Sequence, residues 1–115
     1  MKKKILFIDD MKEVYDKVSS ILEKRYDVDY TQNEQEALNM IKTKNYDKII
    51  TDYHLGTYSP KGGLNIIRVA KDKGLSAILM STENHEQEAL EAGADKFIFK
   101  KELYKNIEQI IKNER

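Results

Sequence analysis

The chain has 115 residues, 40% of them hydrophobic and 35% charged, which suffices for one globular domain with a real core. Twenty basic residues balance 20 acidic ones, so charge alone does not favour a nucleic-acid or acidic-ligand surface. The absence of cysteine excludes disulfides, thiolate catalysis and cysteine-based zinc sites. The apolar run Ile5–Ile8 is too short for a signal peptide or a membrane span, so we expect a cytoplasmic protein that does not contact membranes.

The first half of the chain predicts a strand, a helix, a strand and a helix. Ile5–Ile8 is continuously apolar, as expected for a strand that is covered on both faces. Apolar residues at helical spacing follow from Met11 to Lys24. The more polar Val28–Tyr30 predicts a strand at the edge of the sheet, and Ala37–Ile41 marks a helix with Asn33 as its N-cap.

The second half repeats this alternation three more times. Its predicted elements are a strand at 48–51, a helix at 64–73 ended by Gly74, a strand at 77–80, a helix at 86–92 ended by Gly93, a strand at 97–99 and a helix whose inner stripe is Leu103, Ile107, Ile110 and Ile111. Five successive βα units predict an α/β fold with a parallel sheet and helices on both faces. The loop 56–63 contains the only proline, and we expect it to be mobile.

Polar side chains follow four of the five predicted strands. Asp9 and Asp10 follow the first strand, Asp52 the third, Ser81 the fourth and Lys100 the fifth, whereas the second strand contributes nothing comparable. Ligands of open α/β sheets bind beyond the carboxyl ends of the strands, where these groups should converge. Three carboxylates near one lysine are costly without a cation, so the pattern predicts a site for Mg²⁺ or Mn²⁺.

Each of these residues also has an ordinary structural interpretation. Asp10 could cap the following helix, Ser81 could cap a turn, and Lys100 could be a solvated surface charge. All of these interpretations would have to hold together at one end of the sheet. Their shared position therefore favours a functional site.

The combination resembles the receiver domain of two-component response regulators, the CheY-like family, along essentially the whole chain. The resemblance is carried by the acidic pair in ILFIDD, by Asp52 in IITDYHL, by Ser81 in ILMST and by EAGADKFIFK, which ends at Lys100. It implies a single receiver domain over residues 1–115. It also implies a flavodoxin-like, doubly wound (βα)5 fold with the strand order 2-1-3-4-5.

The resemblance further implies a phosphoacceptor and a metal site. Asp52 would accept a phosphoryl group as an acyl phosphate. Asp10 and Asp52 would bind Mg²⁺ through their carboxylates, Asp9 would act directly or through a water molecule, and the backbone carbonyl of His54 would be a further ligand.

Four other residues acquire roles by the same resemblance. Lys100 would pair with one phosphoryl oxygen, and Ser81 would hydrogen-bond another. Ser81 and Phe97 would move together as the switch. His54 and Glu83, each two residues after a site residue, would modulate the loss of the phosphoryl group to water.

The chain departs from the family pattern at three places. Lys101 replaces the proline that usually follows the lysine in a cis bond, so we expect a trans bond here and an altered connection to the last helix. The segment 81–93 is about a turn shorter than is usual, which should shorten the fourth helix. Gly56 replaces a common proline, and the loop that follows it should be slightly expanded.

The predicted function is that of a signalling domain rather than an enzyme. Its phosphoryl donor would be a histidine kinase or a phosphotransfer protein, and its target another protein, without direct nucleic-acid binding; we expect a monomer or a weak homodimer. Two alternatives stay open: an interaction module that no longer takes phosphate, and an aspartate-nucleophile phosphatase, although His54 stands where such enzymes place a second acid. A nucleotide- or flavin-binding protein is disfavoured, because DDMKEV after the first strand lacks glycine.

Overall fold

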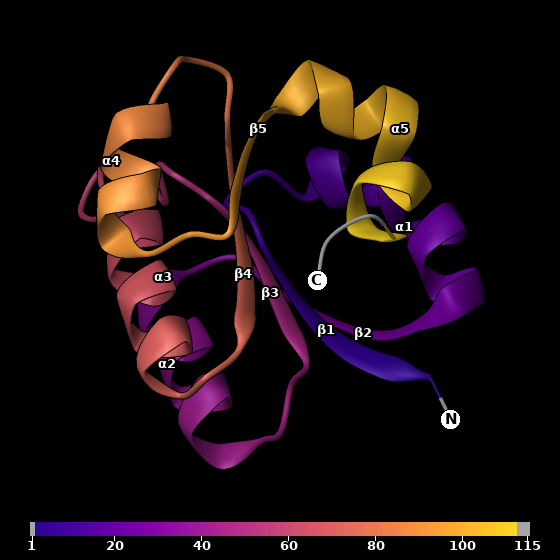
Figure 1. The fold of residues 1–115 in the computed structure, drawn as a ribbon, viewed down its shortest axis with the longest axis horizontal. Coiled ribbons are helices and arrows are strands. Elements are labelled where there is room, and N and C mark those ends of the chain that lie inside the picture. Colours follow the sequence, from indigo (N-terminus) through magenta and orange to yellow (C-terminus); the bar gives the residue numbers. More distant parts are fainter. Residues whose placement is uncertain (1, 113–115) are drawn as a thin grey trace.

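The computed structural model describes residues 2–112 and contains one sheet of five parallel strands in the order β2-β1-β3-β4-β5 (Figure 1). The strands are β1 (Lys3–Ile8), β2 (Tyr26–Thr31), β3 (Lys48–Asp52), β4 (Ser76–Ser81) and β5 (Lys96–Phe99). The predicted fold class, strand order and outer position of the second strand are therefore confirmed.

Five helices alternate with the strands and cover both faces of the sheet. They are α1 (Lys12–Arg25), α2 (Glu34–Thr43), α3 (Gly62–Asp72), α4 (Glu86–Ala92) and α5 (Lys100–Lys112). Helices α2, α3 and α4 lie on one face and α1 and α5 on the other (Figure 1).

The inner strand β1, which lies between β2 and β3, supplies side chains to both cores. Leu6 and Ile8 pack in the core beneath α2, α3 and α4, whereas Ile5 and Phe7 pack in the core beneath α1 and α5. All four are fully buried, which explains why this run is continuously apolar rather than alternating. Leu103 and Ile107 are buried on α5 as predicted, whereas Ile110 and Ile111 lie outside the described side chains.

Several predicted boundaries differ from the structure, among them the starts of β2 and α3. Strand β2 begins immediately after α1, two residues earlier than predicted, because it pairs with β1 along its whole length from Lys3↔Tyr26 to Ile8↔Thr31. Helix α3 begins at Gly62 instead of residue 64. The preceding loop is closed by backbone hydrogen bonds from Leu55 N to the Ser59 carbonyl (2.9 Å) and from Ser59 N to the Gly56 carbonyl (3.0 Å).

The predicted N-cap of α2 and the predicted glycines at the ends of α3 and α4 are confirmed. The Asn33 side chain accepts a hydrogen bond from Glu36 N (2.7 Å) and caps α2. Gly74 and Gly93 follow α3 and α4 with φ of 82° and 104°, a conformation that favours glycine.

The fourth helix is short, and the trans bond predicted before Lys101 is confirmed. Helix α4 has only seven residues. Helix α5 begins at Lys100, directly after β5, and every peptide bond in the described residues is trans, including the one before Lys101. Among the described residues, no helix has the length and apolar character needed to cross a membrane.

Candidate phosphorylation and metal site

The carboxyl ends of four neighbouring strands bring the predicted site residues together. Asp9 directly follows β1, Asp52 ends β3, Ser81 ends β4 and Lys100 follows β5. All four are buried, and Asp9 has no exposed surface. Polar residues so placed cannot be ordinary surface groups, because burial without partners is costly.

Three carboxylates form one cluster at this edge. Oxygens of Asp9, Asp10 and Asp52 all lie within 4.8 Å of one another. Asp10 is partly exposed and does not cap α1, because the N-cap position is Met11 and no side chain caps the helix there. Capping therefore does not explain the second aspartate of the pair.

Lys100 bridges two of the carboxylates. Its Nζ lies 2.8 Å from Asp9 Oδ2 and 3.1 Å from Asp52 Oδ2. Asp9 Oδ2 is buried and has this ion-pair partner, but it has no regular hydrogen bond among the described residues. The interpretation of Lys100 as a solvated surface charge is wrong.

Burial and like charges shift the pKa values of this cluster. Burial, reinforced by the charge of Asp9, raises the pKa of Asp52 to about 6 despite the nearby Lys100. Burial also raises the pKa of Asp9, against the opposing effect of the nearby Lys100 ammonium. Burial disfavours the charge on Lys100, but its contacts with Asp9 and Asp52 outweigh this and raise its pKa. One ammonium therefore does not fully compensate the carboxylates.

The oxygen cluster fits a hard divalent cation. Mg²⁺ prefers oxygen ligands and uses one or two carboxylates together with water and phosphate oxygens. The three clustered carboxylates and the poorly satisfied Asp9 Oδ2 match this preference. Within the described part of the chain, no backbone N–H donates to the His54 carbonyl, which leaves this oxygen available as a further ligand.

An open cleft of about 580 Å³ gives access to Asp52. Its lining residues lie at or beyond the carboxyl ends of β1, β3, β4 and β5 and include Asp10, Met11, His54, Lys61, Ser81 and Lys100. A larger hollow of about 870 Å³, bordered by Lys4, Tyr26 and Asp47, lies at the opposite, amino end of the strands, away from the carboxylate cluster. The smaller cleft therefore lies at the carboxylate cluster, whereas the larger hollow does not.

Comparison with known families decides what kind of domain carries this site. The family described as "Response regulator receiver domain" matches residues 5–112 of the chain. The chain belongs to this family. Receiver domains are phosphorylatable signalling domains of two-component systems, and they bind a divalent metal.

Solved structures show the same receiver fold at low sequence identity. A CheY-like receiver domain protein from Methanospirillum hungatei JF-1 has a TM-score of 0.78 and 23% identity, over 97% of this chain and 95% of that one. A response regulator from Burkholderia pseudomallei, with a phosphorylated aspartic acid, a calcium ion and citrate, has a TM-score of 0.80 and 22% identity. The match covers 99% of this chain and 67% of that one. The BeF3-activated DrrB receiver domain has a TM-score of 0.77 and 21% identity, and the match covers 98% of this chain and 100% of that one. The comparison with curated proteins gave no match.

Of the other residues singled out from the sequence, Ser81, His54 and Glu83 line the cleft of this receiver domain, whereas Phe97 does not. Ser81 Oγ accepts a hydrogen bond from Glu83 N (3.1 Å), so the hydroxyl now closes a turn. Phe97 is half-buried against the core beneath α2–α4 and meets Phe99 edge-to-face at 5.2 Å. His54 and Glu83 are exposed and line the cleft.

Sequence reasoning missed two supports of the receiver site. Strand β2, from which we expected no contribution, holds the backbone of Asp9 through the Thr31 carbonyl and the Tyr30 hydroxyl. Gly63 packs against the Asp52 backbone, where a Cβ would lie 2.1 Å from the Asp52 carbonyl oxygen. The two adjacent glycines of the loop were the only available signal for the second support.

A third missed feature is a polar cluster next to Asp52, formed by Tyr53, Lys61, His85 and Glu88. The ring of Tyr53 stacks on His85 with centroids 3.6 Å apart, and the Tyr53 hydroxyl donates to the Glu88 carboxylate at 3.0 Å. Glu88 also contacts His85 Nδ1 at 3.1 Å and Lys61 Nζ at 3.5 Å. The residue that follows the phosphoacceptor candidate is thus linked directly to α4.

Proposed function

We propose that Asp52 accepts a phosphoryl group from a histidine kinase or a phosphotransfer protein in a Mg²⁺-dependent step, and that this switches a partner-binding surface. The observation that carries the proposal is the cluster of Asp9, Asp10 and Asp52 within 4.8 Å, with Lys100 between two of its members. The open cleft beside Asp52 gives a donor access to it.

In this proposal the chain itself supplies the ligands for Mg²⁺ or Mn²⁺. They are the carboxylates of Asp10 and Asp52 and the backbone carbonyl of His54, with Asp9 acting directly or through a water molecule. A bound divalent ion neutralises oxygens of the transferred group, which phosphoryl transfer requires.

The transfer step exchanges one bond to phosphorus for another. A carboxylate oxygen of Asp52 attacks the phosphorus of a phosphohistidine, the P–N bond breaks, and its electron pair returns to the imidazole nitrogen. The product is an acyl phosphate on Asp52. Lys100 Nζ, 3.1 Å from Asp52 Oδ2, is placed to pair with a phosphoryl oxygen.

Ser81 and Phe97 form the proposed switch. The Ser81 hydroxyl leaves its turn with Glu83 N to hydrogen-bond a phosphoryl oxygen, and Phe97 moves inward with it. The surface formed by α4, β5 and α5 changes as a result. His54 and Glu83, exposed at the cleft, adjust how fast water removes the phosphoryl group.

The wider proposal is a cytoplasmic signalling module rather than an enzyme. Residues 1–115 act as a single receiver domain, as a monomer or a weak homodimer. The target is another protein, with no direct contact to nucleic acid or membrane.

The test is intact-mass spectrometry after incubation with acetyl phosphate, in Mg²⁺ and in EDTA, on the wild type and on Asp52→Asn. We expect a single phosphoryl adduct on the wild type in Mg²⁺ alone. Adduct formation on Asp52→Asn, or equal formation in EDTA, would contradict the proposed site or its metal dependence.

If the adduct is hydrolysed too rapidly to accumulate, binding of a beryllium fluoride complex that mimics the phosphoryl group is measured instead. Binding that requires Mg²⁺ and Asp52 supports the proposal even when no adduct accumulates. Neither an adduct nor binding would leave the chain as an interaction module.

A further inference from the structure

The backbone of Asp9 is held on both sides by the outer strand β2. Its N–H donates to the Thr31 carbonyl at 3.2 Å, and its carbonyl accepts a hydrogen bond from the Tyr30 hydroxyl at 2.7 Å. Its side chain is held separately, because Oδ1 accepts a hydrogen bond from Met11 N at 2.9 Å. Tyr30 is therefore a side-chain support for the peptide group that joins the two aspartates.

The Tyr30 ring is itself fixed by aromatic packing. It stacks on Tyr15 with centroids 4.7 Å apart and an interplanar angle of 11°, and it meets Phe7 at 6.5 Å. The Tyr15 hydroxyl donates to Glu23, which lies on the far part of α1 and outside the carboxylate cluster. The two stacked rings thus carry hydroxyl groups with separate partners.

Asp10 depends on its backbone for its direction. Within the described residues its side chain makes no hydrogen bond or ion pair, and α1 begins only at Lys12. The Asp9 carbonyl and the Asp10 nitrogen belong to one rigid peptide plane. Holding the carbonyl oxygen therefore fixes the rotation of this plane and the position of the Asp10 α-carbon, from which the side chain leaves the backbone.

We infer that Tyr30 is a positioning residue: its hydroxyl fixes the Asp9–Asp10 peptide group so that the Asp10 carboxylate faces the divalent-cation site. This inference rests on the proposed function, because it assigns Asp10 to a metal. Groups that orient metal ligands typically change metal affinity by about 10–100-fold when they are removed. Tyr30 does this through a backbone carbonyl and has no contact with the ion itself.

The experiment is a Mg²⁺ titration of the unphosphorylated full chain by isothermal calorimetry, on the wild type, Tyr30→Phe and Tyr15→Phe. We expect the Kd for Mg²⁺ to rise about tenfold in Tyr30→Phe, at the low end of the range for such supports. Tyr15→Phe is the matched control, because it removes a hydroxyl from the same aromatic stack without touching Asp9. It should leave the Kd unchanged.

Thermal unfolding in EDTA separates positioning from a loosened fold. Phenylalanine keeps the ring in the stack, so both variants should be folded at the titration temperature. A Kd equal to that of the wild type in Tyr30→Phe, or an equal rise in both variants, would overturn the inference while the proposed metal site stands. A wild type that binds no Mg²⁺ would overturn the proposed metal site and this inference together.

Discussion

The α-carbon of Gly63 lies against the backbone carbonyl of Asp52. A Cβ at residue 63 would lie 2.1 Å from that oxygen, closer than any non-bonded contact allows, and Gly63 N also donates to the Tyr53 carbonyl at 3.0 Å. The start of α3 thus sets the position of the segment that carries the proposed phosphoacceptor.

Gly63→Ala should destabilise the protein by about 3 kcal/mol, at the upper end of the cost of overpacking, because the obstacle is backbone that cannot rotate away. Urea unfolding measures this loss. Gly62→Ala is the matched control, since its nearest obstacle at 2.8 Å is the Glu34 Oε1 atom, at the end of a flexible side chain. Equal losses in the two variants would contradict a specific contact with Asp52.

Asp52→Asn should stabilise the metal-free protein at neutral pH. Folding raises the pKa of Asp52 from 3.8 to about 6, so the folded state binds its proton more tightly than the unfolded state. The stabilising contribution of that proton is complete below pH 3.8 and is lost as the pH rises through about 6. Ionised Asp52 then costs on the order of 2–3 kcal/mol, which the neutral amide avoids.

Urea unfolding in EDTA at about pH 4 and about pH 7.5 measures how the stability difference between Asp52→Asn and the wild type depends on pH. The variant should gain stability over the wild type only at the higher pH, and added Mg²⁺ should reduce the difference. Asp16→Asn, on the exposed face of α1, is the control and should show little change between the two values. A wild type more stable than Asp52→Asn at the higher pH in EDTA would contradict the prediction.

The strands and the site residues could be predicted because both follow local rules. Ile5–Ile8 is apolar because β1 is buried on both faces, and this is visible in the residues themselves. Parallel strands end at one edge of the sheet, so Asp9, Asp52 and Lys100 could be placed together without knowing any distance.

The supports of the site could not be predicted because they depend on distances between elements. The sequence predicts only that Tyr30 belongs to a polar edge strand, and the register Phe7↔Tyr30 is what places its hydroxyl near Asp9. The apolar pattern of α3 begins at Leu64 and so predicts a loop at Gly62 and Gly63, although both are buried in the first turn of the helix.

Lys100→Met should destabilise the metal-free protein, because it leaves Asp9 and Asp52 buried without their cation. Removing one partner of a buried pair costs about 3–5 kcal/mol, and we expect the lower end because the carboxylates can take up protons instead. Added Mg²⁺ replaces the missing charge, so it should stabilise this variant more than it stabilises the wild type. Thermal unfolding in EDTA and in Mg²⁺ measures both effects.

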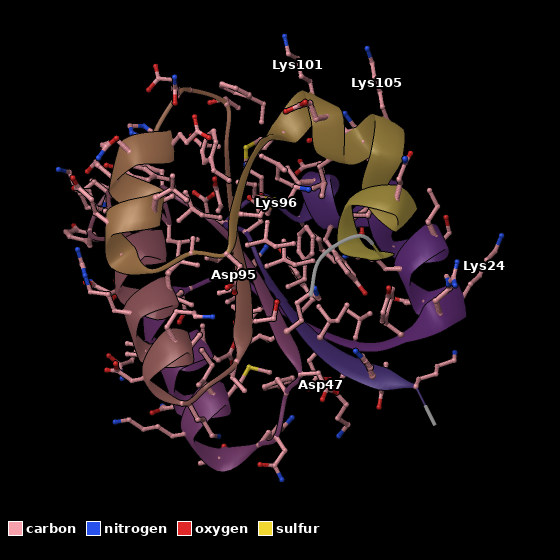
Figure 2. All side chains as sticks on the ribbon, in the orientation of Figure 1. Lys24, Asp47, Asp95, Lys96, Lys101 and Lys105 are labelled. Atoms are coloured by element: carbon pink, nitrogen blue, oxygen red, sulfur yellow. The ribbon has the colours of Figure 1, made fainter. Side chains whose placement is uncertain are left out.

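The neighbouring lysine gives a matched control for this experiment. Lys101 is exposed and projects outward from the start of α5 (Figure 2). Lys101→Met should change the stability little under either condition. A similar loss in both variants would show that the start of α5, rather than the buried ion pair, accounts for the effect.

Glu88→Ala should loosen α4 without unfolding the domain. A helix of seven residues is too short to be stable alone, and Glu88 ties it to Tyr53 and Lys61. Losing these contacts lowers the local stability of α4, so its amides should exchange about tenfold faster. Hydrogen exchange followed by mass spectrometry measures this, with the amides of β3 as the internal reference.

Glu91→Ala is the control for this experiment, because Glu91 contacts only Gln87 on its own helix among the described residues. Equal exchange of the α4 amides in both variants would show that the link to Tyr53 does not hold α4.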